Sequence, residues 1–89
     1  MVGHLDSISP NPMNLAPGAD DDGSGAAGVL ALARFSNGLK GRANIRFLIT
    51  LGEEQGMLGS KAYVSAMTAE EIAKTRNVIT MDMIGFDKI

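Results

Sequence analysis

Acidic and imidazole side chains occur at four places along the chain, and their types are those that bind divalent cations. His4 and Asp6 form the first pair, an aspartate run occupies residues 20–22, Glu53-Glu54 form a second pair, and Asp82 lies within VITMDMIG. Imidazole nitrogens and carboxylate oxygens are the side-chain atoms that would coordinate such a cation. The chemistry depends on whether the fold brings these groups together.

The aspartate run lies in GADDDGSGAAG, residues 18–28, and two familiar loop types fail to explain it. A G-x-G-x-x-G nucleotide loop would follow a strand directly and receive a pyrophosphate, whereas here a proline-bearing loop comes first and three carboxylates would repel phosphate. An EF-hand loop with Gly23 as its sixth residue would begin at Gly18 and end at Val29, and neither can supply the required carboxylate.

A simpler interpretation is that the aspartates cap a helix near Ser24 and lie at its positive end. This accounts for one aspartate or two. Three adjacent carboxylates repel one another, and a bound cation would offset that charge directly. A metal-bridging carboxylate is the third interpretation of the loop.

Alternating strand and helix patterns predict an α/β fold with parallel strands and right-handed crossovers. The first expected elements are a short strand in residues 1–6, a loop over 7–23 and a largely buried helix from Ser24 to about Ser36. A strand over 44–51 and a helix from Gly56 to about Met67 follow. A capping box at Thr68 and Glu71 then opens a short helix that ends near Arg76, and NVITMDMI over 77–84 is the last strand.

In an open parallel sheet, functional groups gather beyond the carboxyl ends of the strands. His4 and Asp6 end the first expected strand, Glu53-Glu54 follow the second, and Asp82 lies near the end of the third. We therefore expect all five groups at one edge. An ionised Asp82 inside a buried strand also needs a partner, and because no Lys or Arg stands at the neighbouring strand ends, a metal ion is the simplest one.

Each group also has an ordinary interpretation. A lone His is more often a satisfied polar residue than a ligand, and the Glu53-Glu54 pair could be solvated. The pair Glu70-Glu71 has a local role in its capping box, but Glu53-Glu54 has none. This contrast favours a functional role for the earlier pair.

Composition limits the classes of function. Eighty-nine residues make at most one domain, and a net charge of −2 gives no nucleic-acid footprint, so nucleic acid is not expected as a partner. Without cysteine the chain has no disulfide and no thiolate metal site, which leaves the compartment open. No apolar run is long enough to span a membrane. The N-terminus leads at once into His4, and the chain is interpreted as a fragment.

Four segments resemble, in order, the signature blocks of the di-zinc aminopeptidase family, which includes bacterial leucyl aminopeptidases and, more distantly, glutamate carboxypeptidase. They are HLDS at 4–7, PGADDDGSG at 17–25, EEQGMLGS at 53–60 and MDMIG at 81–85. The resemblance implies a three-layer αβα fold with a mostly parallel sheet. On this basis residues 1–89 are expected to be an N-terminal to central fragment of a single zinc-peptidase catalytic domain.

The resemblance also implies a role for each acidic group. The implied metal ligands are His4, Asp21, Glu54 and Asp82, with Asp21 bridging two zinc ions, Asp82 completing the His4 site and Glu54 binding the second ion. Asp6 is implied as the carboxylate that orients His4, and Glu53 as the general base toward the water between the ions. A cis peptide bond is implied between Asp21 and Asp22.

The implied function is that of a zinc-dependent metallo-aminopeptidase that hydrolyses the first peptide bond of substrates with a free N-terminus. A further His ligand of the family lies downstream of Asp82, and His4 is the only His here, so the isolated chain is expected to be weakly active. The alternative is a non-catalytic binding relative or a single-zinc glutaminyl cyclase of the same fold. Secretion or periplasmic export is favoured by the resemblance alone, and the oligomeric state stays open.

Overall fold

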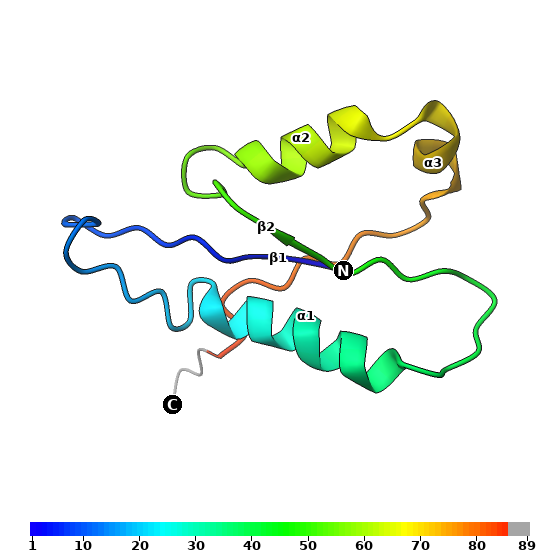
Figure 1. Cartoon of the computed structure of the whole chain (residues 1–89), viewed down its shortest axis with the longest axis horizontal. Helices are drawn as coiled ribbons and strands as arrows, with labels where there is room; N and C mark the ends of the chain where they lie inside the picture. Colours follow the sequence, from blue (N-terminus) through cyan, green and yellow to red (C-terminus); the bar gives the residue numbers. More distant parts are fainter. Residues whose placement is uncertain (86–89) are drawn as a thin grey trace.

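Two short parallel strands and three helices make up the chain in the computed structural model, which describes residues 1–85 (Figure 1). The elements are β1 (Val2–His4), α1 (Gly23–Ser36), β2 (Leu48–Thr50), α2 (Leu58–Ala66) and α3 (Ala69–Lys74). The chain is an α/β unit, as the alternating pattern predicts. In the view of Figure 1, α1 lies below the strands, and α2 and α3 lie above them.

Strand β1 lies between two parallel partners. On one side it pairs with β2, with Val2 opposite Leu48 and His4 opposite Thr50. On the other side, Val2 forms an isolated parallel bridge with Thr80, through bonds from the Val2 amide to the Ile79 carbonyl (2.9 Å) and from the Met81 amide to the Val2 carbonyl (2.8 Å). The predicted parallel arrangement is confirmed.

The predicted strand over 77–84 is wrong, because only the bridge at Thr80 forms. Beyond the bridge the chain turns onto α1, where a Cβ added at Gly28 would meet the side chains of Met81 and Ile84. The Met83 amide donates to the Asp22 carboxylate at 3.3 Å. These contacts draw the segment away from β1, so the ladder stops after one bridge.

Helix α1 packs against the strands through one face, on which Gly25, Ala26 and Val29 are buried. The prediction of a largely buried helix is wrong, since the side chains of Leu30 and Phe35 are 56% and 75% exposed. The prediction followed from apolar residues on nearly all sides of the helix. Within residues 1–85, only the strand-facing side of α1 is covered.

The capping box that opens α3 is confirmed. The Thr68 hydroxyl accepts a hydrogen bond from the Glu71 amide at 3.2 Å, and the Glu71 carboxylate accepts one from the Thr68 amide at 2.9 Å. Arg46 also donates to Glu71 at 2.8 Å, which ties the segment before β2 to α3. Within residues 1–85, no helix has both the length and the apolar character that a membrane span needs.

Candidate metal centre

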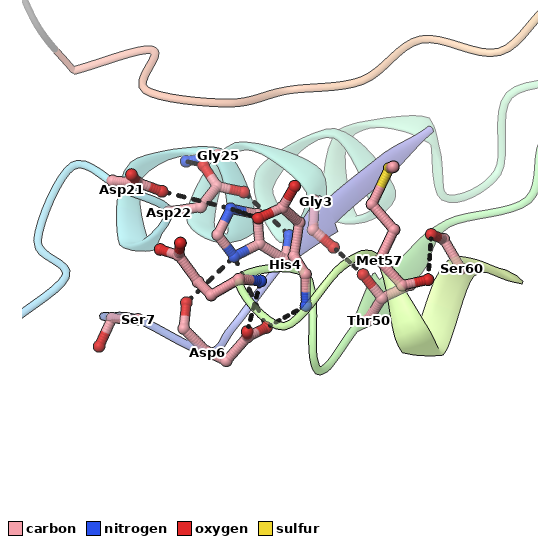
Figure 2. A network of polar contacts seen from close by, with 12 residues as sticks. Gly3, His4, Asp6, Ser7, Asp21, Asp22, Gly25, Thr50, Met57 and Ser60 are labelled. Atoms are coloured by element: carbon pink, nitrogen blue, oxygen red, sulfur yellow. Dashed lines mark hydrogen bonds and ion pairs between the residues drawn. The ribbon is translucent and has the colours of Figure 1, made fainter. Parts of the chain in front are cut away.

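The ring of His4 lies at the carboxyl end of β1, almost fully buried with 4% of the residue exposed. Its Nδ1 is 3.0 Å from the backbone carbonyl of Asp6. Because a carbonyl oxygen can only accept a hydrogen bond, Nδ1 carries the proton and donates. The other nitrogen, Nε2, faces the loop before α1, as Figure 2 shows.

Asp21 and Asp82 approach this free nitrogen from two different segments. The Oδ1 atom of Asp21 lies 3.3 Å from Nε2 of His4. Asp82 joins them from the segment that follows the bridge at Thr80, and one ligand atom from each of the three residues lies within 4.8 Å of the others. The structure thus brings together side chains from three distant parts of the sequence.

Asp82 is exposed, which differs from the prediction made from the sequence. Asp82 is expected inside a buried strand, where an unpaired carboxylate would be costly, but the strand does not form and Asp82 is exposed. Burial therefore gives no reason for a cationic partner. The reason now lies in the short distances of this carboxylate to His4 and Asp21.

The three side chains suit a zinc ion in chemistry, and the spacing of His4 and Asp21 suits it as well. With bonds of about 2.0–2.1 Å, two ligands of one tetrahedral zinc lie about 3.3 Å apart. The separation of 3.3 Å between His4 and Asp21 matches this value. A neutral Nε2 with its lone pair toward a carboxylate is repulsive, and either a proton or a cation between the two atoms removes the repulsion.

The Glu53-Glu54 pair follows β2 at the same edge. The Oε2 atom of Glu53 lies 4.0 Å from Nε2 of His4, on the side of the ligand group. The carboxylate of Glu54 does not belong to the group of three within residues 1–85. Its nearest charges nevertheless include Asp21 and Glu53, so it borders the same cluster.

Asp6 forms hydrogen bonds with both the His4 ring and the Glu53-Glu54 segment. Its carbonyl accepts from the His4 ring, while its carboxylate accepts from the amides of Glu53 (3.2 Å) and Glu54 (3.1 Å). The carboxylate itself is 3.6 Å from Nδ1 of His4, too far for a good hydrogen bond. Asp6 therefore orients the imidazole through its backbone and the glutamate segment through its side chain.

Electrostatics at the centre follow from these contacts. Burial alone lowers the pKa of His4, but the bond to the Asp6 carbonyl and the charges of Asp22 and Glu53 outweigh it, so the pKa lies above 6.5. Burial alone raises the pKa of Asp6, but the hydrogen bonds that its carboxylate accepts from the amides of Glu53 and Glu54 outweigh this, so the pKa lies below 3.8. Partial desolvation and the neighbouring carboxylates of Asp21 and Glu53 raise the pKa of Glu54.

Asp22 is a buried member of the site that the sequence argument did not single out. It is the N-cap of α1, accepts from the Gly25 amide at 3.0 Å, and has only 1% of its surface exposed. Its place directly before a helix was the available signal. The peptide bond between Asp21 and Asp22 is cis, as the family resemblance implied.

Comparison with known proteins agrees with this geometry. Residues 1–88 match the sequence profile of peptidase family M28, and the chain belongs to this family. It is 39% identical to a probable leucine aminopeptidase 2 of Aspergillus oryzae over 93% of the chain, and 33% identical to the aminopeptidase YwaD of Bacillus subtilis over 96%. It is also 39% identical to a probable zinc metalloprotease of Pyrenophora teres over 97% of the chain.

The chain spans only a small part of these relatives, from 16% to 19% of their length. No solved structure matches the chain at a significant level.

Proposed function

We propose that the protein is a zinc-dependent metallo-aminopeptidase and that the described chain carries part of its catalytic site. The observation that supports this most directly is the convergence of His4, Asp21 and Asp82, with ligand atoms within 4.8 Å of one another, in a chain of a peptidase family. The names of the relatives, two aminopeptidases and a zinc metalloprotease, agree with both the metal and the reaction.

In this proposal His4 and Asp82 would hold one zinc ion, Glu54 would hold a second, and Asp21 would be shared between them. Zinc supplies Lewis acidity, which lowers the pKa of water and polarises the scissile carbonyl. A second ion is consistent with the acidic surroundings of Glu54, whose pKa is raised by burial and by the nearby carboxylates. The proposal includes a three-layer αβα domain, of which residues 1–89 are one part.

Glu53 is the proposed general base. Its carboxylate lies beside the ligand group, 4.0 Å from His4, and its side chain is partly exposed. It would accept a proton from the attacking water and pass that proton to the leaving amine. Asp6 keeps the Glu53 backbone in place through its amide, so the base cannot move freely relative to His4.

The acidic surroundings also suggest how the substrate is chosen. Asp21, Glu53 and Glu54 gather at one edge, where a positively charged α-amino group is favoured over a neutral or anionic end. A peptide with a free N-terminus would therefore present its first bond to the base. The alternatives, a non-catalytic binding protein or a glutaminyl cyclase, are not favoured, because the relatives are named as peptidases.

The decisive experiment uses the protein expressed from its complete reading frame. Hydrolysis of a leucyl chromogenic amide is measured as isolated, after removal of metal with a chelator, and after zinc is added back. We expect activity to vanish on chelation and to return with zinc. The N-acetylated form of the same substrate should not be cleaved. Equal cleavage of both substrates, or activity that survives chelation, would refute the proposal.

A further inference from the structure

Asp22 is a buried carboxylate to which the proposed reaction gives no role. Its Oδ2 atom accepts a hydrogen bond from the His4 amide at 2.9 Å, and its Oδ1 atom accepts from the amides of Gly25 (3.0 Å) and Met83 (3.3 Å). Figure 2 shows its side chain between the His4 backbone and Gly25. Three backbone amides from three segments therefore meet on one carboxylate.

Helix capping explains only one of these bonds. An N-cap needs one acceptor for an amide of the first turn, and an exposed Ser, Thr or Asn commonly supplies it. The other two bonds leave the helix and reach the end of β1 and the segment beyond Thr80. Each of these segments carries a proposed ligand, since one amide is that of His4 itself and the other follows Asp82.

The space for this carboxylate exists because two neighbouring residues are glycines. A Cβ added at Gly3 would lie 3.2 Å from Oδ2 of Asp22, and one added at Gly25 would collide with the Asp22 carboxylate and the Met81 carbonyl. Glycine is a poor helix former, yet Gly25 stands in the first turns of α1. Gly25 thus lowers the helix propensity of α1 but leaves the space that the buried Asp22 carboxylate occupies.

We propose that Asp22 is a positioning residue that fixes His4, Asp21 and Asp82 relative to one another before the metal binds. An ionised carboxylate can accept all three bonds, and hydrogen bonds to a charged acceptor are stronger than those to a neutral one. Asp21 is held because it is the adjacent residue. The inference rests on the proposed metal site and assigns to Asp22 the prior alignment of that site's ligands.

The test compares Asp22→Asn and Asp22→Ser with the parent protein, again expressed from its complete reading frame. Asn keeps one acceptor oxygen but turns an NH₂ group toward one of the donors, and Ser keeps at most the bond to Gly25. As a control, Asp20→Asn removes the same charge from the same loop. In the parent protein, Oδ1 of Asp20 accepts hydrogen bonds from the Ser24 hydroxyl and the Gly85 amide, and Asn keeps an oxygen for both. Zinc affinity is measured by competition with a chromogenic chelator, and ligand geometry by the visible spectrum of bound Co²⁺.

We expect both Asp22 variants to lose about 10- to 100-fold in zinc affinity, the usual effect of removing a partner that orients metal ligands, and to shift the Co²⁺ spectrum. Asp20→Asn should match the parent protein in both measurements. If the Asp22 variants only melt at lower temperature, with unchanged zinc affinity and Co²⁺ spectrum when folded, Asp22 is merely structural and the inference is wrong. A parent protein that binds no zinc would instead refute the proposed function and the inference with it.

A measurement on the parent protein covers the case in which the variants do not fold. Met83 lies outside any helix or strand, so its amide should be protected from hydrogen exchange in the metal-free protein only through its bond to Asp22. We expect clear protection of the Met83 amide before zinc is added. Exchange at the rate of an unstructured peptide would show that the segment is not held, and would overturn the inference.

Discussion

Nε2 of His4 lies 3.3 Å from Oδ1 of Asp21, while Nδ1 of the same ring donates to the carbonyl of Asp6. This pair of contacts commits one ring nitrogen to the protein and leaves the other to share a proton or a cation with a carboxylate. In a chain of peptidase family M28, the arrangement is suited to hold zinc. Several measurable consequences follow from the surroundings of the two residues.

Zinc affinity should fall as the pH is lowered, from a higher pH than for an ordinary His. Zinc binds neutral imidazole, and the pKa of His4 in the metal-free protein lies above 6.5 because the Asp6 carbonyl and nearby carboxylates favour the charged ring. Below that pKa we expect about a tenfold loss of affinity per pH unit, since one proton must be displaced. Calorimetric zinc titrations from pH 8 to pH 5.5 measure this slope. A flat profile would contradict the assignment of His4.

The raised pKa of His4 affects the stability of the metal-free protein in the opposite direction: stability decreases as the pH rises. A raised pKa means that the folded state binds the proton more tightly, so charged His4 contributes stability below its unfolded pKa of 6.5. That contribution is lost as the pH rises through the higher folded pKa. Urea unfolding with and without zinc across this range separates the two effects, because bound zinc should reverse the trend.

Glu53→Gln should retain zinc and lose turnover. The substitution keeps the size of the side chain and the hydrogen bond from the backbone amide of residue 53 to the Asp6 carboxylate. It removes only the basic oxygen. We expect turnover to fall by about 10²- to 10⁴-fold, the usual contribution of a general base. Glu70→Gln is the matched control, because Glu70 is an exposed residue of α3 that pairs with Lys74. If Glu53→Gln retains full turnover, the base lies elsewhere.

Asp6→Ala should destabilise the protein. It leaves the amides of Glu53 and Glu54 without their acceptor, and removing one partner of a partly buried bond costs about 1–3 kcal/mol. Asp6→Asn keeps one acceptor oxygen, and its free energy of unfolding should lie between those of Asp6→Ala and the parent protein. Because the pKa of Asp6 is lowered, its contribution is present above 3.8 and is lost as the pH falls through the folded pKa. Urea unfolding at pH 7 and pH 3 provides the measurement. Equal stability of the Ala variant and the parent at pH 7 would contradict this role.

Thr68→Ala should weaken α3 by about 1 kcal/mol, the usual cost of losing an N-cap hydroxyl. The hydroxyl accepts from the Glu71 amide, which would lose its partner. Thr68→Ser keeps the hydroxyl and serves as the control. Hydrogen exchange of the α3 amides reports the change directly, and faster exchange in the Ser variant than in the Ala variant would argue against the capping box.

The sequence determined by itself those features that depend on neighbouring residues. The capping box is an interaction between Thr68 and Glu71, only a turn apart, and the start of α1 follows from the acidic N-cap residue Asp22 directly before the helix. Family membership was also readable, because the four acidic segments keep their order and spacing along the chain. The roles assigned to individual ligands stay predictions.

The tertiary structure decided what depends on contacts between distant segments. The apolar pattern of residues 77–84 suits a strand, yet this segment forms one bridge and then turns onto α1, where the Met83 amide donates to the Asp22 carboxylate. Likewise, no local pattern shows that one carboxylate collects amides from three segments, or that Asp6 acts on the His4 ring through its carbonyl. Hydrogen bonds between distant segments depend on where the folded backbone places their donors, and a sequence pattern describes only neighbours.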